Sequence, residues 1–456
     1  MSARISATKS TGPRIGFYGD DFTGATDTLA TAAQAGLRAM LFLAPPSPAQ
    51  LEAAGPLDCL GIAGAARSMA PDDMAAELEP VGRFFAGLRV PVVHYKTCST
   101  FDSAPGIGSI GAAIRTLGRF ARNPFRPIVG GQPSLDRYCL FATLFAAAEP
   151  GGPVHRLDRH PTMSRHPVTP MDEADLRLHL ARQGLADVRS FAWTSYALPA
   201  SELDARLDHL LADRPDAVLF DVAQPDDLAA IGRAIWRHAA RDPLLAIGPS
   251  SVVQALAACW PGDRTIRVDS SPRRIAPAAG PVLVLAGSLS PVTARQIRSA
   301  VSYERMAIDA ERLALHDAAY FEDLLSRVIG RLQAGHSVLA HTAPLEPEGP
   351  GRKPVHRGPA LATACGDFLA RLLGAFRLHR IGIAGGDTSS HGLKALGLWG
   401  LSYVGSLSPG VAVCRTHAAP GPLDGIEVML KGGQMGPPDL FERLLRGAVP
   451  PSPNSG

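Results

Sequence analysis

The stretch IGFYGDDFTGATD, residues 15–27, contains the pattern that decides the fold. Its first four residues form a short apolar run typical of a strand, two adjacent acids follow, and residues 25–35 favour a helix. The same alternation continues along the chain, with further strand candidates at residues 39–43, 58–63 and 90–95. Strands that alternate with helices indicate βαβ units and a mostly parallel sheet.

The length of the chain, 456 residues, predicts two domains, because one core rarely grows that large. Residues 263–281 contain three prolines and many charges, and we interpret them as a linker. The sequence thus predicts an α/β fold with two domains, residues 14–262 and 280–448, each with a mostly parallel sheet flanked by helices. Residues 149–172, rich in Pro, His and Arg, predict a long ordered loop.

The composition excludes some classes of partner. A net charge of +3 with 19% charged residues is not the strongly basic composition expected of a protein that binds nucleic acid or an anionic membrane. One local cation could still bind a small anion. No apolar run reaches the ~18 residues of a spanning helix. Six cysteines without CxxC spacing, and a first segment without the apolar core of a secretory signal, favour a cytoplasmic protein with reduced thiols. The sequence leaves a homo-oligomer open.

Asp20 and Asp21 are the candidate catalytic residues. Ligands of open parallel sheets usually bind at the carboxyl ends of strands, where this pair is expected. Neighbouring carboxylates repel each other unless a cation, a donor or solvent relieves them. Phosphoryl transfer to an alcohol needs a carboxylate that orients the hydroxyl and accepts its proton, and we favour Asp21 for this role. The alternative is that the pair only caps the helix.

A second polar cluster, KTCST, follows the strand candidate that ends at residue 95. Lys96, together with the hydroxyls of Ser99 and Thr100, could hold a carboxylate or a phosphate of the substrate. A surface turn is the alternative. Three histidines in the basic segment 155–166 lack the spacing of a zinc site, so this segment is expected to fold over an anionic ligand.

Residues 106–111, GIGSIG, match the GxGxxG fingerprint of dinucleotide-binding folds. The match is in the wrong context, because ten residues separate it from the preceding strand and no acid lies about 20 residues further on. We interpret it as a glycine-rich helix start near the substrate.

Three glycine-bearing turns follow strand candidates in the second half: residues 287–293, 385–389 and 431–436. Glycines let backbone N–H groups approach phosphate oxygens, and helix N-termini favour anions. Together the turns predict a ligand rich in phosphate. The Walker A pattern is absent from the sequence, so a P-loop enzyme is excluded.

Six motifs in this order resemble the four-carbon acid sugar kinase family over nearly the whole chain: GDDFTGATD, KTCST, HPVTPM, GSLSPVTARQI, GGDTSSH and LKGGQMG. The resemblance implies an N-terminal domain for a tetronate-type sugar acid and a C-terminal domain for ATP. It implies substrate contacts at Asp20, Asp21, Arg67 and Lys96. It implies ATP contacts at Ser288, Gly385, Gly386, Asp387, Thr388 and Gly433. The chemistry implies Mg²⁺, which bridges phosphate oxygens.

The turn after Lys96 departs from the family pattern, in which many members carry DSTLRG. Cys98 stands in place of the acid and Asp102 in place of the arginine. The expected substrate is a sugar acid of the tetronate, 3-oxo-tetronate or 3-oxo-isoapionate type, and these changes make a keto or branched acid such as 3-oxo-isoapionate a candidate in place of the usual tetronate. Two other functions stay open: an NAD-dependent oxidoreductase of a small hydroxy acid, and a sugar-acid sensor without catalysis.

Overall fold

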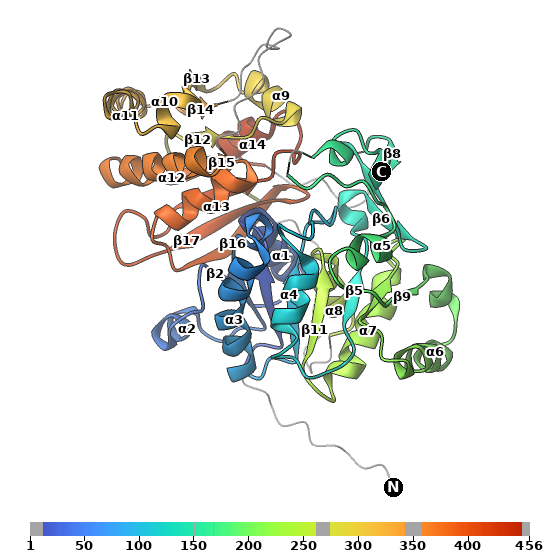
Figure 1. The fold of residues 1–456 in the computed structure, drawn as a ribbon. Helices are drawn as coiled ribbons and strands as arrows, with labels where there is room; N and C mark the ends of the chain where they lie inside the picture. Colours follow the sequence, from blue (N-terminus) through green and yellow to red (C-terminus); the bar gives the residue numbers. More distant parts are fainter. Residues whose placement is uncertain (1–11, 150, 167, 261–273, 343–357, 449–456) are drawn as a thin grey trace.

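The computed structural model of the chain describes residues 12–149, 151–166, 168–260, 274–342 and 358–448 (Figure 1). A fifteen-stranded sheet runs through both halves of the chain, and a separate three-stranded sheet lies beside it. The predicted α/β class, with two mostly parallel halves, is confirmed. Within the described ranges, no helix has the length and apolarity needed to cross a bilayer.

The N-terminal half contributes eight strands that all pair in parallel. In sheet order they are β2 (Ala39–Phe42), β3 (Cys59–Ala63), β1 (Ile15–Gly19), β4 (Val92–Lys96), β11 (Leu244–Gly248), β5 (Pro127–Val129), β10 (Ala217–Phe220) and β9 (Val188–Phe191). The helices of this half are α1 (Phe22–Gln34), α2 (Pro48–Ala54), α3 (Pro71–Gly87), α4 (Ile110–Leu117), α5 (Leu176–Ala181), α6 (Ala200–Ala212), α7 (Asp227–Ala239) and α8 (Ser251–Ala258).

Strand β1 is buried along its whole length, because helices cover both faces of the sheet. Ile15 and Phe17 pack in one hydrophobic cluster with α1, α7 and α8, while Tyr18 packs in the cluster of α3 and α4 on the other face. Helix α1 begins three residues earlier than predicted, because the Asp21 side chain caps it by accepting a hydrogen bond from the N–H of Gly24.

The C-terminal half contributes the other seven strands of the large sheet. In sheet order they are β13 (Glu304–Ala307), β14 (Val338–His341), β12 (Leu283–Ala286), β15 (Arg380–Ala384), β18 (Glu427–Lys431), β17 (Val411–His417) and β16 (Gly400–Ser408), of which the first five are parallel. Its helices are α9 (Pro291–Ser299), α10 (Ala310–Ala314), α11 (Ala318–Gln333), α12 (Gly358–Ala375), α13 (Gly386–Ala395) and α14 (Leu440–Arg446).

The two halves join where β16 pairs with β2 in antiparallel orientation, with Gly400 opposite Phe42 and Leu401 opposite Leu41. The rings of Phe42 and Trp399 stack at this joint with centroids 5.9 Å apart. One hydrophobic cluster contains residues of α1 and α7 together with residues of α11 and α12. The sheet and its core are therefore continuous, which local sequence patterns did not indicate.

The predicted loop at residues 149–172 is partly wrong. It contains β8 (Val154–Arg156), which completes a small antiparallel sheet with β6 (Arg137–Leu140) and β7 (Thr143–Ala147), and it contains two single 3-10 turns. The hairpin between β6 and β7 is anchored on Asp221, whose carboxylate accepts hydrogen bonds from the N–H groups of Phe141 (2.7 Å) and Ala142 (2.9 Å). Such long-range pairing stabilises a short strand that composition alone does not reveal.

Candidate active site

A cavity of about 410 Å³ lies between the two halves of the chain. It is lined by all the residues predicted to act on the substrate: Asp20, Asp21, Arg67, Lys96, Ser99 and Thr100. The C-terminal half contributes two of the predicted ATP residues, Gly386 and Gly433. The parallel register of β1 with β3 and β4, which sets Gly19 beside Ala63 and Lys96, brings the N-terminal group together.

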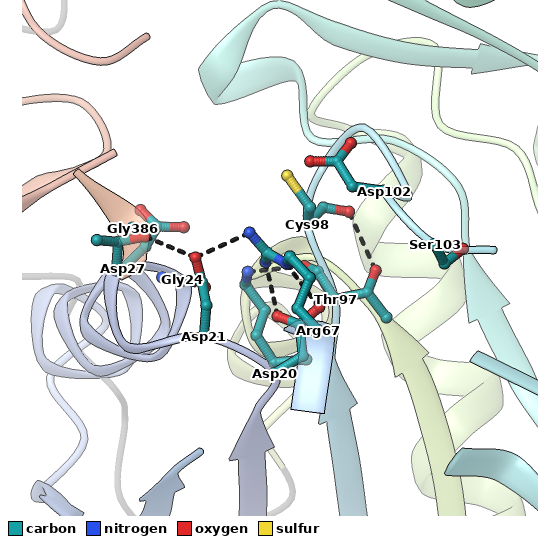
Figure 2. Close-up of polar contacts among 12 residues, drawn as sticks. Asp20, Asp21, Gly24, Asp27, Arg67, Thr97, Cys98, Asp102, Ser103 and Gly386 are labelled. Carbon is teal, nitrogen blue, oxygen red and sulfur yellow. Dashed lines mark hydrogen bonds and ion pairs between the residues drawn. The ribbon is translucent and has the colours of Figure 1, made fainter. Parts of the chain in front are cut away.

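Arg67 joins the two carboxylates of the acid pair (Figure 2). Its Nη2 and Nε donate to Asp20 Oδ1 and Oδ2 at 2.7 and 3.1 Å, and its Nη1 donates to Asp21 Oδ2 at 2.8 Å. One guanidinium therefore relieves the repulsion between two neighbouring like charges.

The environment of Asp20 favours its protonated form. Burial raises the pKa of Asp20 above its ordinary value, and the charge of Asp21 acts in the same direction, although Arg67 and Lys96 oppose both. Asp20 is thus the better proton acceptor of the pair on basicity alone.

The environment of Asp21 favours its ionised form. Burial would raise the pKa of Asp21, but Arg67 and Lys96, the hydroxyl of Thr23 (2.8 Å) and the N–H of Gly24 (2.7 Å) together lower it. Asp21 therefore stays charged at neutral pH. Asp21 caps α1 and also lines the cavity. Its position is therefore compatible with both interpretations, helix capping and catalysis.

Lys96 is buried beside Asp21, and its Nζ donates to the carbonyl of Thr97 at 2.7 Å. A Cβ atom at Gly24 would lie 2.6 Å from this Nζ and 2.5 Å from Asp21 Oδ1. Glycine is therefore required at position 24, because any larger side chain would displace the charged groups of the site.

The turn after Lys96 is held by a chain of hydrogen bonds. The Sγ of Cys98 lies 3.0 Å from the hydroxyl of Thr100, which donates to Asp102 Oδ1 at 2.6 Å. Figure 2 shows the side chains of Cys98 and Asp102 on the same side of this turn. Burial raises the pKa of Cys98 to about 11, so the thiol is neutral at physiological pH.

A buried network under the same turn makes it rigid. Phe101 has a φ of 56°, an uncommon conformation for a residue with a side chain. Its carbonyl accepts a hydrogen bond from Ser103 at 2.8 Å, and the Ser103 hydroxyl also lies 2.8 Å from His179 Nε2 and accepts from Gln183 Nε2. The surrounding structure therefore fixes the position of Asp102 before any ligand binds.

The GxGxxG stretch serves packing rather than nucleotide binding. A Cβ atom at Gly108, where φ is 61°, would lie 2.5 Å from the carbonyl oxygen of Arg67, and one at Gly111 would overlap the backbone of Gln183. The stretch lines no part of the cavity. Gly108 instead lets the loop before α4 approach the segment that carries Arg67, and Gly111 lets α4 approach Gln183, so the motif no longer supports the oxidoreductase interpretation.

The three glycine turns follow β12, β15 and β18, which are adjacent parallel strands, so the turns meet at one edge of the sheet. A Cβ atom at Gly433 would lie 2.6 Å from Ser288 Oγ, and one at Gly385 would lie 3.2 Å from both Ser288 N and Thr388 Oγ1. Helix α13 begins at Gly386. Asp387 lies in its first turn, and its side chain is outside the described part of the structure.

Sequence reasoning missed a buried group behind these turns. Lys431 Nζ donates to Thr293 Oγ1 at 2.8 Å, to Gln296 Oε1 at 2.6 Å and to the carbonyl of Gly433 at 3.3 Å. The amide of Gln296 in turn donates to the carbonyls of Met435, Gly436 and Pro437. The network fixes the last glycine turn, and burial lowers the pKa of Lys431 from 10.5 to about 7.

This lysine predicts a pH-dependent stability. Between about pH 7 and pH 10 the unfolded chain binds a proton on Lys431 that the folded chain does not, so the free energy of unfolding should rise with pH over this range. Lys431→Met is expected to remove that part of the rise, as measured by the midpoint of denaturant unfolding at several pH values. Lys394→Met, at an exposed lysine of α13, should keep the slope of the wild type, and equal slopes in all three proteins would contradict the prediction.

The cavity also has residues that the sequence did not single out: Asp27, Gln132, Arg137 and His391. His160 and His166 of the basic segment line it as well, as expected for a segment folded over a ligand. Within the described ranges, no three His, Cys, Asp or Glu side chains group closely enough to hold one metal ion. Asp27 and His391 end two of the family motifs, whereas Gln132 and Arg137 lie outside all six motifs and reach the cavity only through the packing of β6 and the segment before it.

At the cavity, Asp21 of the N-terminal half lies near Gly386 of the C-terminal half. A Cβ atom at Gly386 would lie 3.8 Å from Asp21 Oδ2. The carboxylate from the first strand end therefore adjoins the helix start of the second glycine turn, where a phosphate is expected to bind.

Known proteins resemble this chain over most of its length. Residues 15–256 match a family described as the sugar-binding N-terminal domain, and residues 283–441 match the nucleotide-binding C-terminal domain. The chain is 37% identical to a 3-oxo-isoapionate kinase of Paraburkholderia graminis, over 95% of this chain and 94% of that protein. It is 29% identical to a 3-oxo-tetronate kinase of Methylobacterium radiotolerans, over 94% and 98% of the two chains.

Solved structures share the fold. A Salmonella typhimurium LT2 protein superposes with a TM-score of 0.75 at 23% identity, covering 95% of this chain and 98% of that one. A Haemophilus influenzae protein superposes with a TM-score of 0.67, also at 23% identity, over 94% and 98% of the two chains. The prediction of a sugar-acid kinase is confirmed by the kinase relatives and the two domain families, and the chain belongs to the four-carbon acid sugar kinase family.

Proposed function

We propose that this enzyme transfers the γ-phosphoryl group of ATP to a hydroxyl of 3-oxo-isoapionate or a closely similar branched 3-oxo acid. The observation that carries the proposal is that one cavity contains both Asp21 and the Gly386 turn, which adjoin there. A volume of about 410 Å³ suits a small sugar acid and the phosphate end of a nucleotide. The similarity to a 3-oxo-isoapionate kinase supports the choice of substrate.

In this mechanism Asp21 orients the acceptor hydroxyl and takes its proton as the oxygen attacks the γ-phosphorus. The bond between that phosphorus and the bridging oxygen of ADP breaks, and ADP leaves. Arg67 holds Asp21 in place through a 2.8 Å hydrogen bond, and Asp20 keeps the guanidinium oriented by accepting two more. The backbone N–H groups at Gly386 and Gly433 are suited to hold phosphate oxygens.

Asp27 is the carboxylate that best fits a magnesium ion. It lines the cavity, its Oδ2 accepts hydrogen bonds from Ser250 and Gln132, and its Oδ1 accepts none from the described residues. Mg²⁺ in kinases is bound mainly by phosphate oxygens and water, with one or two carboxylates, so one open oxygen suffices. When bound, the ion neutralises the charge that develops on the phosphates.

The turn after Lys96 supports a substrate other than a linear tetronate. Cys98 is neutral, and Asp102 places a carboxylate on the cavity wall, with Oδ1 occupied by Thr100 and Oδ2 accepting no hydrogen bond from the described residues. An unoccupied carboxylate oxygen at this place is suited to accept a hydrogen bond from a substrate hydroxyl. A branched acid with an additional hydroxymethyl group offers such a donor.

The direct test measures ADP release with ATP, Mg²⁺ and a panel of acids: 3-oxo-isoapionate, 3-oxo-tetronate, threonate and erythronate. We expect kcat/KM to be highest for 3-oxo-isoapionate, and the phosphorylated product should appear in equal amount to ADP. A higher kcat/KM for a linear acid would reject the substrate assignment. ATP binding without turnover of any acid would favour the sensor.

The proposal places the reaction in the cytoplasm, where ATP is available and thiols stay reduced. All six cysteines are present as free thiols, and four of them are buried. A homo-oligomer stays a prediction, which the mass of the protein in solution would test.

A further inference from the structure

A sugar acid brings a carboxylate into the cavity, and this group needs a cationic partner where water is excluded. Among the described residues that line the cavity, the permanent cations are Arg67, Lys96 and Arg137. The partner of the substrate carboxylate should be the one whose charge is not already used by the protein.

Arg67 and Lys96 are already used. Arg67 donates three hydrogen bonds to the acid pair, and Lys96 donates to a backbone carbonyl while its charge lowers the pKa of Asp21. The charge of Arg67 is used by direct ion pairs with both acids, and the charge of Lys96 acts on the same two acids, so neither is the best partner for a third carboxylate.

Arg137 is different. Its Nη1 donates only to the backbone carbonyls of Leu135 and Asp136. Its Nε is buried without a hydrogen-bond partner, and its Nη2 donates to none of the residues that the structure describes. No described carboxylate lies within ion-pair distance of it. A partly buried cation with two unused donor groups is costly unless an anion arrives.

The position of Arg137 is well fixed by its backbone. It is the first residue of β6, it pairs with Ala146 of β7, and its N–H and carbonyl both bond to the backbone of Gln132. The side chain of Gln132 reaches Asp27 of α1 at 3.2 Å. The small sheet is therefore tied to the helix that follows the acid pair, and the guanidinium is held at the cavity wall before a ligand binds.

We infer that Arg137 binds the carboxylate of the sugar acid and thereby sets the selectivity of the enzyme for acids over neutral sugars. This inference rests on the proposed function and extends it to a residue outside the motifs. A guanidinium with adjacent unused N–H groups binds a carboxylate through two parallel hydrogen bonds, which fixes both its place and its orientation. The other end of the acid then extends along the cavity toward Asp21.

The test compares Arg137→Met with the wild type on two substrates, 3-oxo-isoapionate and its primary amide. The variant is expected to raise the KM for the acid by roughly 10²- to 10³-fold, because it removes a charge-assisted pair in a desolvated site. The KM for ATP should stay within about twofold. On the amide, which has no negative charge, wild type and variant should have nearly equal kcat/KM.

Two further variants make the result specific. Arg137→Lys keeps the charge without the planar fork, so it should recover part of the affinity for the acid. Arg159→Met is the matched control. Arg159 lies in the turn that directly follows β8 of the same three-stranded sheet, its side chain is 78% exposed, and it lines no part of the cavity. It should behave as the wild type. The melting temperature and ATP affinity of each variant show whether it folds.

The outcomes separate this inference from the proposed function. If Arg137→Met lost kcat/KM equally on the acid and on the amide, Arg137 would not be the residue that binds the carboxylate. The kinase activity of the wild type would be unaffected by that result. A raised KM for ATP alone would assign Arg137 to the nucleotide instead. Absence of activity in the wild type with every acid would reject the proposed function itself.

Discussion

Asp21→Asn is expected to lower kcat by roughly 10²- to 10⁴-fold, the usual contribution of a positioned general base. Asparagine has nearly the size of aspartate and caps helices about as well, so α1 should keep its N-terminal hydrogen bond. The affinity for ATP should change little, because the glycine turns belong to the C-terminal half and asparagine keeps the size of the side chain that lies near Gly386. Steady-state kinetics with both substrates, and the melting temperature, measure the two effects separately.

The matched control is Asp309→Asn. Asp309 also caps a helix, α10, by accepting from the N–H groups of Glu311 and Arg312, and it lies outside the cavity. This variant should keep its full kcat. If Asp21→Asn also kept full kcat and only melted earlier, the acid pair would be structural, and the catalytic assignment would fail.

The pH dependence of kcat/KM distinguishes the two acids. The pKa of Asp21 is lowered, so a base at this position stays ionised and active to a lower pH than an ordinary aspartate would. The pKa of Asp20 is raised by burial, so a base there would lose activity at a higher pH, as it becomes protonated. If kcat/KM fell at a pH above the ordinary aspartate pKa, and this fall disappeared in Asp20→Asn, the general base would be Asp20 and not Asp21.

Gly386→Val is expected to lower kcat/KM for ATP by about 10²-fold or more, while the protein still folds. Outside its chain neighbours and the backbone of α13, a Cβ at this position would come within 4 Å of one atom of the described residues, Asp21 Oδ2, at 3.8 Å, which is an ordinary contact. The added side chain therefore projects into the shared cavity, where it would keep phosphate oxygens away from the backbone and from the acceptor hydroxyl. The measurements are the KM for ATP, kcat and the melting temperature.

Two other glycines provide the comparison. Gly330→Val adds the same side chain to α11, where a Cβ atom meets nothing within 4 Å, and should leave the kinetics unchanged. Gly433→Val should destabilise the fold as well, because its Cβ atom would lie 2.6 Å from Ser288 Oγ and 3.2 Å from Ser290 Cβ. Normal ATP kinetics in Gly386→Val would show that phosphate does not bind at this turn.

Several features follow from the sequence by itself. The apolar run before the acid pair, and the alternation after it, predicted parallel α/β architecture, because strand and helix periodicity are local properties. The glycine turns were recognised for the same reason, since each lies within a few residues of its strand. The motifs also predicted the family, which the domain matches confirm.

Other features were decided only by the tertiary structure, because they depend on segments far apart in the chain. The sequence predicted two separate sheets, but the pairing of β16 with β2 joins them into one. No local sequence pattern shows that the edge strands β2 and β16 pair with each other. Asp21 and Gly386 are 365 positions apart in the sequence, yet they adjoin in the fold. Lys431 and Arg137 look like ordinary strand residues until packing buries their charges. Burial and proximity, which set the chemistry of this site, are properties of the whole fold and not of any stretch of sequence.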